Sequence, residues 1–202
     1  MRSAVVLSGG GSRRLGGEKG LRQLAGRPMV SWVIERLRAT VDEVVVVVGP
    51  EVDPSPYVGL GAIVVRDEVE ARTPLAGAST GLSRASGEYS FLTGCDYPLV
   101  NHRVVELLFG EADGHDAATP IWPNGYVEPL HAVYASKPSA ALAERLLTHG
   151  ETRLSLILRS LEDVSRVPMD SLRRVDPDLL SLLDVDTEED VNRAEALLAR
   201  PS

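Results

Sequence analysis

The chain has 202 residues, of which 44% are apolar and 25% charged, and these values are typical of a soluble globular protein. This composition excludes intrinsic disorder. A disulfide scaffold is excluded because the single cysteine, Cys95, cannot form an internal bridge, and a single cysteine suits a reducing cytoplasm. The net charge of -8 disfavours a nucleic-acid surface, and no apolar run approaches the roughly 20 residues that span a bilayer. We therefore expect a cytoplasmic protein, with one domain over residues 1–202 and with neither nucleic acid nor membrane as a partner.

The predicted elements alternate between strands and helices along the chain. Short β-rich runs, above all the five valines at 44–48, indicate strands that are covered on both faces. The predicted strands cover residues 4–7, 44–48, 62–65, 89–93, 117–121, 127–134 and 182–185. The predicted helices run from Pro28 to 37, over 75–85, from a cap at Asn101 to 108, over 137–149 and 153–161, and from a cap at Thr187 to 200. The alternation predicts an α/β fold with a mostly parallel sheet flanked by helices.

Three loops at the ends of predicted strands carry the candidate chemistry. They follow Leu7, and they contain Asp67 and Asp96. Ligands of open α/β sheets bind outside the carboxyl ends of the strands, so these loops are expected to lie together. A site built from them needs no second domain.

The glycine-rich loop after the first strand is the most informative segment, because glycines let backbone N–H groups approach a phosphate. It is not a dinucleotide fingerprint, since Arg14 stands where a motif starting at Gly9 needs its last glycine. It is not a Walker loop either, since Glu18 precedes Lys19. Residues 9–27 hold five cations and one acid, a local charge of +4 in a chain of -8. This balance favours a triphosphate site, and the alternative is a solvated loop whose arginines pair with acids elsewhere.

Asp96 is the candidate metal ligand. A lone carboxylate together with substrate phosphates is the usual way in which proteins hold Mg²⁺, and the alternative is an aspartate that caps the next helix. Cys95 has no histidine near it in the sequence, so we interpret it as a buried structural residue. The four histidines show no spacing typical of zinc ligands.

Several segments resemble the molybdenum cofactor guanylyltransferases, a family of nucleotidyltransferases often called MobA. The segments are 7–10 with 14–21, 24–29, 74–77, 95–98, 128–134 and 184–190. The resemblance implies a Rossmann-like nucleotidyltransferase fold. It also implies a reaction in which Mg-GTP donates GMP to the phosphate of molybdopterin and pyrophosphate leaves. Transient contact with cofactor-biosynthesis proteins or molybdoenzymes would follow from such a role.

The resemblance also implies roles for single residues. It places Leu7, Ser8, Gly9 and Gly10 around the base and ribose of the nucleotide. Gly77 would let the purine approach, and Asp67 would contact the nucleotide. The resemblance implies catalytic roles for Arg14, Lys19 and Asp96. Among them, Lys19 would neutralise the triphosphate and Asp96 would hold Mg²⁺.

A few positions depart from the guanylyl pattern. Asp184 and Asp186 replace the usual asparagines, Val47 stands where an asparagine often contacts the nucleotide, and Glu128 replaces a common glutamine. The acidic pair is commoner in the sister group that uses CTP, whereas Gly9 favours GTP. If Asp184 or Asp186 approaches the metal, it would be a second carboxylate ligand. A CTP enzyme, a guanylyltransferase for another phosphorylated acceptor and a non-catalytic nucleotide-binding protein remain alternatives to GTP and molybdopterin.

Overall fold

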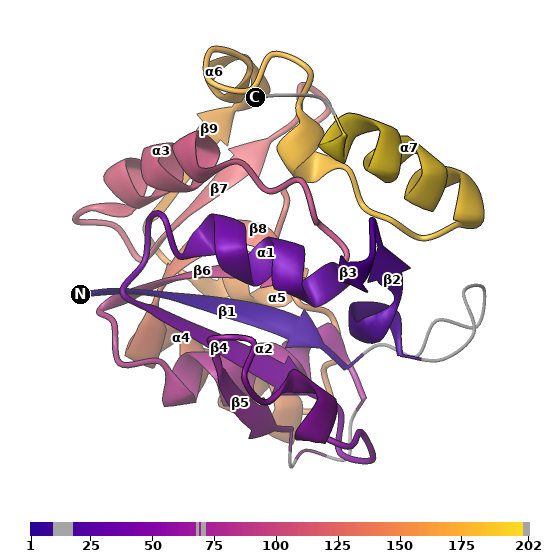
Figure 1. Cartoon of the computed structure of the whole chain (residues 1–202). Helices are drawn as coiled ribbons and strands as arrows, with labels where there is room; N and C mark the ends of the chain where they lie inside the picture. The colour runs from indigo at the N-terminus through magenta and orange to yellow at the C-terminus, as the bar shows by residue number, and fades with distance from the viewer. Residues whose placement is uncertain (10–17, 68, 70–71, 200–202) are drawn as a thin grey trace.

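A seven-stranded sheet forms the centre of the computed structural model, which describes residues 1–9, 18–67, 69 and 72–199 (Figure 1). The strand order is β5-β4-β1-β6-β8-β7-β9. The strands are β1 (Arg2–Ser8), β4 (Glu43–Val48), β5 (Ile63–Arg66), β6 (Tyr89–Gly94), β7 (Ala117–Ile121), β8 (His131–Ala135) and β9 (Val164–Pro168). Among these described strands only β8 runs antiparallel to its neighbours. The mostly parallel sheet that the alternation predicted is confirmed.

The valine run of β4 shows why these residues form central strands. Val44, Val46 and Val48 face one hydrophobic layer, and Val45 and Val47 face the other. Successive side chains of a strand point to opposite faces, so a strand covered on both sides must be apolar throughout. Because β5, β4, β1 and β6 are parallel, their carboxyl ends meet at one edge of the sheet.

Helices cover both faces of the sheet (Figure 1). One face carries α1 (Met29–Leu37) and α3 (His102–Ala112), and the other carries α2 (Pro74–Arg84), α4 (Ser136–Thr148) and α5 (Ser155–Ser160). The remaining helical segments are η1 (Lys19–Leu21), η2 (Ser55–Tyr57), α6 (Met169–Arg173), η3 (Leu180–Leu182) and α7 (Glu188–Leu198). In the described part of the chain, every helix is too short or too polar to cross a membrane.

Two predicted helix starts are confirmed by their caps. The side chain of Asn101 accepts a hydrogen bond from the backbone N–H of Arg103 at 2.9 Å, at the start of α3. Thr187 accepts from the N–H of Asp190 at 3.2 Å, and the Asp190 carboxylate accepts from the N–H of Thr187 at 2.8 Å. This reciprocal pair is a capping box, and it satisfies backbone donors that the first turn of α7 leaves free.

The strand predicted over 182–185 is wrong. Leu182 ends η3, and the chain then crosses the end of the sheet without joining it as a strand. One backbone hydrogen bond ties it down, from the N–H of Val185 to the carbonyl oxygen of Asp96 at 2.9 Å. Val185 is apolar because it is buried against α7, and a residue of a buried strand must be apolar too, so the sequence pattern of the two is alike.

The strand predicted over 127–134 is too long, because β8 begins only at His131. Pro129 lacks a backbone N–H and cannot extend the ladder, and Val127 forms only an isolated bridge with Ile121. The sequence pattern predicts neither β9 nor α6. Both are short, and β9 lies at an edge of the sheet where the pattern of buried residues is weak.

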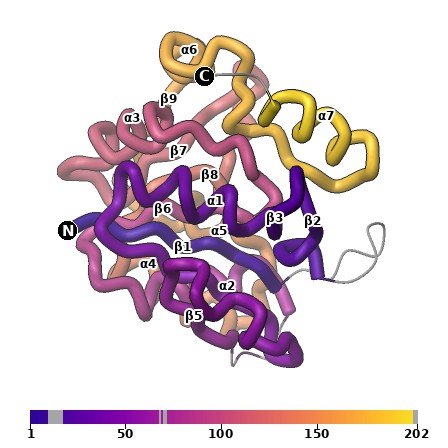
Figure 2. The backbone as a smooth tube through the Cα atoms, viewed as in Figure 1, coloured from indigo at the N-terminus to yellow at the C-terminus, as the bar shows by residue number. Residues whose placement is uncertain are grey.

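A small hairpin connects the start of the chain to its last helix. It consists of β2 (Gln23–Leu24) and β3 (Arg27–Pro28), and it lies beside α7 (Figure 2). Its turn places Ala25 at a φ of 49° and Gly26 at 76°, in the left-handed region that favours glycine. The backbone N–H of Ala25 donates to Glu195 of α7 at 2.7 Å. The residues just after Lys19 are therefore fixed to the C-terminal segment.

Candidate active site

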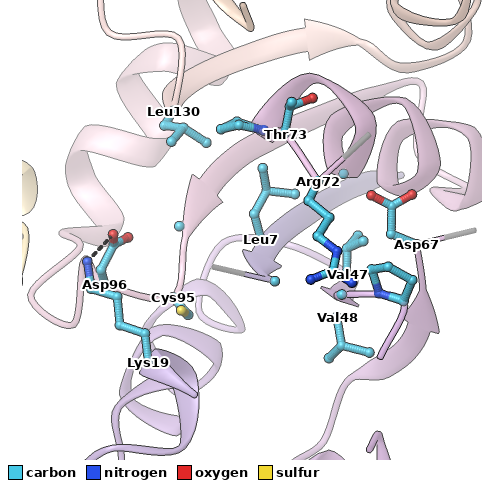
Figure 3. Close-up of a pocket in the computed structure, with 16 residues that line it drawn as sticks. Leu7, Lys19, Val47, Val48, Asp67, Arg72, Thr73, Cys95, Asp96 and Leu130 are labelled. Atoms are coloured by element: carbon cyan, nitrogen blue, oxygen red, sulfur yellow. Dashed lines mark hydrogen bonds and ion pairs between the residues drawn. The ribbon is translucent and has the colours of Figure 1, made fainter. Parts of the chain in front are cut away.

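A cavity of about 190 Å³ opens at the carboxyl ends of β1, β4, β5 and β6, where the three candidate loops were expected to meet. Its lining includes six of the predicted site residues, namely Leu7, Gly9, Lys19, Asp67, Gly77 and Asp96. Gly10 and Arg14 lie outside the described residues. Figure 3 shows Lys19 and Asp96 at one end of the cavity and Asp67 and Arg72 at the other, with Leu7 between them. The cavity thus has charged residues at both ends and an apolar wall between them.

The wall between the two ends depends on close approaches of the backbone. A Cβ atom at Gly9 would lie 3.1 Å from the backbone nitrogen of Gly49, so any other residue there would push the loops after β1 and β4 apart by a few tenths of an ångström. A Cβ atom at Gly77 would lie 3.2 Å from Leu7 Cδ2. The start of α2 therefore packs directly on Leu7, and the two residues form one apolar wall of the cavity.

Asp67 stands at the end of the cavity away from Asp96, and its carboxylate is held in place. Its Oδ1 atom accepts from the hydroxyl of Thr80 at 2.8 Å and from the N–H of Val69 at 3.1 Å. Only 5% of the residue is exposed. Nearby Arg72 pairs with Glu51 at the rim, a contact that the sequence analysis did not predict.

Asp96 owes its position to the residue at the end of β6. A Cβ atom at Gly94 would collide with Asp96 Oδ1, so glycine is needed for the carboxylate to lie where it does. The adjoining N–H of Cys95 donates to the carbonyl of Leu7 at 2.9 Å, which aligns the loops after β1 and β6. Gly94 was not among the predicted residues, although glycine at a strand end next to a candidate carboxylate is a readable signal.

Lys19 meets Asp96 across 77 residues of sequence. Its ammonium nitrogen lies 2.7 Å from Asp96 Oδ2, and it also pairs with Asp186 Oδ1. Burial by itself lowers the pKa of Lys19, but the attraction of both carboxylates outweighs this and raises it. Asp184 stands in the same field, and its pKa is raised by burial and by repulsion from Asp186 and Asp96.

The short turn that carries Lys19 packs closely on Ser8 and Tyr57. A Cβ atom at Gly20 would collide with Ser8 Oγ and lie 3.1 Å from the hydroxyl of Tyr57, so the turn closes down only as glycine. Tyr57 is fully buried, and its hydroxyl shares a hydrogen bond with Ser8 at 2.9 Å and donates to Glu18 at 3.3 Å. Ser8 is thus placed under the turn and outside the cavity lining. Tyr57 was missed because its segment looked like an ordinary loop.

Cys95 lies beside Asp96, but its chemistry is not that of a nucleophile. It is 4% exposed, and burial together with the nearby Asp96 charge raises its pKa to about 12. A thiolate is therefore disfavoured at neutral pH, which agrees with the structural role that the sequence predicted.

A buried polar network anchors the segment that carries Asp184 and Asp186. The Ser181 hydroxyl accepts from the N–H of Asn101 at 3.0 Å and shares a hydrogen bond with His131 Nε2 at 2.8 Å. The N–H of Ser181 donates to Asp176 at 2.8 Å. Burial lowers the pKa of His131 to about 3, so the imidazole stays neutral and acts as a hydrogen-bonding strut.

A second group of side chains, outside the cavity lining, interacts with Asp184. Trp122 donates its indole N–H to Glu128 at 2.5 Å, and burial raises the pKa of Glu128 with a further contribution from Asp184. Tyr126, on the tight turn between the two, is 57% exposed. Glu128 therefore extends the negative field around Asp184, and of these three residues only Glu128 is singled out by the sequence.

The donor set at the Lys19 end fits a divalent cation. Oxygens of Asp96 and Asp186 already converge on one positive charge, the Lys19 ammonium. Carboxylate oxygens are the ligands that Mg²⁺ prefers, and it commonly takes one or two of them with the rest from phosphates and water. In the described residues there is no cluster of three or more His, Cys, Asp or Glu side chains that could hold a metal alone. The arrangement suits a metal that arrives with a phosphate ligand.

Comparison with known proteins gives a consistent family. The MobA-like NTP transferase domain matches residues 4–164. A molybdenum cofactor guanylyltransferase from Desulfosudis oleivorans is 34% identical over 198 residues, with 97% of this chain and 95% of that one covered. A probable molybdenum cofactor guanylyltransferase from Natronomonas pharaonis is 36% identical over 202 residues, with 98% of each covered.

Solved structures agree on the fold. Molybdopterin-guanine dinucleotide biosynthesis protein A from Archaeoglobus fulgidus superposes with a TM-score of 0.80 at 30% identity, over 98% of this chain and 99% of that one. A 2-C-methyl-D-erythritol 4-phosphate cytidylyltransferase from Thermus thermophilus gives 0.73 at 19% identity, over 98% of each chain. The second likeness concerns the fold alone. Both confirm the nucleotidyltransferase fold that the resemblance implied.

Proposed function

The chain belongs to the MobA-like NTP transferase family, and from this premise we propose that it transfers GMP from Mg-GTP to the phosphate of molybdopterin. An oxygen of the acceptor phosphate attacks the α-phosphorus of GTP, the bond between the α- and β-phosphates breaks, and pyrophosphate leaves. The products are molybdopterin guanine dinucleotide and pyrophosphate. The observation that carries the proposal is the cavity in which an apolar, glycine-lined wall at Leu7 joins the Lys19–Asp96 end to the Asp67 end. We take residues 1–202 as one domain with this activity.

The end of the cavity with Leu7, Gly9, Gly77 and Asp67 suits the nucleoside. Leu7 and the start of α2 offer an apolar surface to a purine, and backbone at Gly9 can approach the ribose without a side chain in the way. Guanine presents two neighbouring N–H donors, which a carboxylate can accept. At Asp67 the Thr80 and Val69 bonds both end on Oδ1, which leaves Oδ2 to accept from such a donor.

The other end suits the phosphates. Asp96 would hold Mg²⁺, with Asp186 as a second carboxylate, and the metal would supply neutralisation of the charge that develops on the phosphates. Lys19 would bind the triphosphate through its ammonium, and Arg14 and the backbone of Gly10 would add to that binding from the loop after β1. Transfer of this kind depends on positioning and charge stabilisation more than on a covalent nucleophile.

The position of the acidic pair supports GTP over CTP. The argument for CTP rests on Asp184 and Asp186, which replace asparagines of the guanylyl pattern. Asp186 pairs with Lys19 at the phosphate end, whereas the base end is formed around Asp67. The acidic pair therefore bears on metal and phosphate binding and not on the identity of the base.

Calorimetric titration with GTP, CTP, ATP and UTP, each with Mg²⁺, tests the base. We expect GTP to bind more tightly than the other three, and pyrophosphate release to require molybdopterin as well as GTP. Tighter binding of CTP would contradict the proposed donor. Release of pyrophosphate with a different phosphorylated acceptor and not with molybdopterin would contradict the proposed acceptor.

The cellular setting belongs to the same proposal. We place the reaction in the cytoplasm, because the single buried Cys95 has no partner for a disulfide and suits a reducing compartment. The product must pass to enzymes that use it, so transient contact with molybdoenzymes or cofactor-biosynthesis proteins is part of the role. Co-purification of the tagged protein with such enzymes would test this contact.

A further inference from the structure

The Lys19 ammonium occupies the point on which two carboxylates converge. It lies 2.7 Å from Asp96 Oδ2 (Figure 3), and it also pairs with Asp186 Oδ1. The side chains of Lys19 and Asp96 are 11% and 24% exposed, so water screens this pair weakly, whereas Asp186 is 49% exposed. Asp184 adds a third negative charge to the field around the same point. The nucleotide-free protein therefore holds its own cation where the acidic group is most negative.

Lys19 engages one oxygen of Asp96 and one of Asp186, so a divalent metal bound to the same two carboxylates would lie close to its ammonium. Ammonium and metal are both cations, and two cations sharing one pair of carboxylates would repel each other. A lysine ammonium sits on a flexible four-carbon stem and can leave the pair when another anion is offered. The triphosphate of a nucleotide is such an anion, and the cavity runs up to Lys19.

Resting on the proposed function, we propose that Lys19 is the resident counter-cation of the metal site, so that the divalent metal enters only together with a nucleoside triphosphate. The triphosphate draws the ammonium away from Asp96 and Asp186 and frees their oxygens. The coupling is reciprocal, since a metal on the two carboxylates also leaves the ammonium free for phosphate. The free protein avoids loading a metal that has no substrate with it.

Binding of Mn²⁺ to the nucleotide-free protein, followed by the electron paramagnetic resonance signal of free Mn²⁺, tests this directly. We expect Lys19→Gln to bind Mn²⁺ at least about tenfold more tightly than wild type, which corresponds to about 1.4 kcal/mol. Lys19→Arg keeps the charge and should keep the weak affinity. Lys137→Gln is the matched control, because Lys137 is the only other lysine and its ammonium bonds to the Ser83 and Ala85 carbonyls.

The gain must also depend on the carboxylates. Adding Asp96→Asn to Lys19→Gln should abolish it. Equal or weaker Mn²⁺ binding by Lys19→Gln, or a gain that persists without the Asp96 carboxylate, would overturn the inference. In that case normal binding of Mg-GTP by wild type would leave the proposed function standing. Failure of wild type to bind Mg-GTP would instead refute the proposed function, and this inference with it.

A second measurement uses the unaltered protein. Because the chain has only two lysines, isotope labelling of lysine side chains gives two ammonium signals in nuclear magnetic resonance, and Lys137→Gln identifies them. We expect Mg²⁺ alone at millimolar concentration to leave the Lys19 signal in place, and Mg-GTP to move it. Displacement of the signal by Mg²⁺ alone would overturn the inference, even if the position 19 variants failed to fold.

Discussion

Gly94→Ala should separate the chemistry of the site from its stability. The added Cβ atom would collide with Asp96 Oδ1, while its contact with Tyr97 Cδ2 at 3.4 Å is ordinary. The colliding atom belongs to the free end of a side chain, so the carboxylate turns away and the backbone stays. We expect the free energy of unfolding to change by less than about 1 kcal/mol. A displacement of about 1 Å at a reacting group can cost about 10²-fold in rate, and we expect a loss of kcat/KM of that size.

Pyrophosphate release and urea unfolding, measured on the same preparation, test both parts. Gly110→Ala in α3 is the matched control, since its Cβ atom would meet nothing within 4 Å. Alanine is favoured over glycine inside a helix, so the control should gain about 0.5–1 kcal/mol and keep full activity. Turnover of Gly94→Ala near that of wild type would refute the idea that this glycine positions Asp96. Loss of the fold would refute the claim that only the carboxylate moves.

Other residues give further expectations. Asp96→Asn should leave the fold intact and lower turnover at least about a hundredfold if the carboxylate holds the metal, and pyrophosphate release near the wild-type rate would contradict that role. Tyr57→Phe removes a buried hydroxyl that bonds to Ser8 and Glu18 and should cost about 1–2 kcal/mol in urea unfolding, so an unchanged midpoint would contradict its bracing role. His131 should stay neutral from pH 5 to 8 in an imidazole titration, because burial lowers its pKa to about 3 and favours the uncharged form. Cys95, with its pKa raised to about 12, should react with a thiol reagent at pH 8 only after unfolding in guanidinium.

The sheet and the position of the site could be predicted because both follow from local patterns. The valine run at 44–48 can only be satisfied by a strand covered on both faces, and the helices after Pro28 and Asn101 begin where their caps stand. Parallel strands place their carboxyl ends at one edge, so Asp67 and Asp96 were expected to meet in one cavity, and they do.

The pairing of Lys19 with Asp186 could not be predicted in the same way. The two residues are 167 positions apart, and nothing local in either segment requires the other. The predicted strand at 182–185 failed for a related reason, since Val185 is buried by a helix and not by a ladder. Tyr57 likewise acts through Ser8 and Glu18, which are distant in sequence. Contacts of long sequence separation depend on how the layers assemble, and periodicity does not record that.

The hairpin against α7 and the hydrogen bond from Val185 to Asp96 have a consequence for protein synthesis. A ribosome completes β1, β4, β5 and β6 long before it reaches Asp186, and domains begin to fold as the chain emerges. The segments that carry Lys19 and Asp96 can therefore emerge and begin to fold while Lys19 still lacks its second carboxylate. The ion pairs of Lys19 are therefore completed only after the segment that carries Asp186 has emerged, and a nascent chain that stalls before it would lack the second of the two.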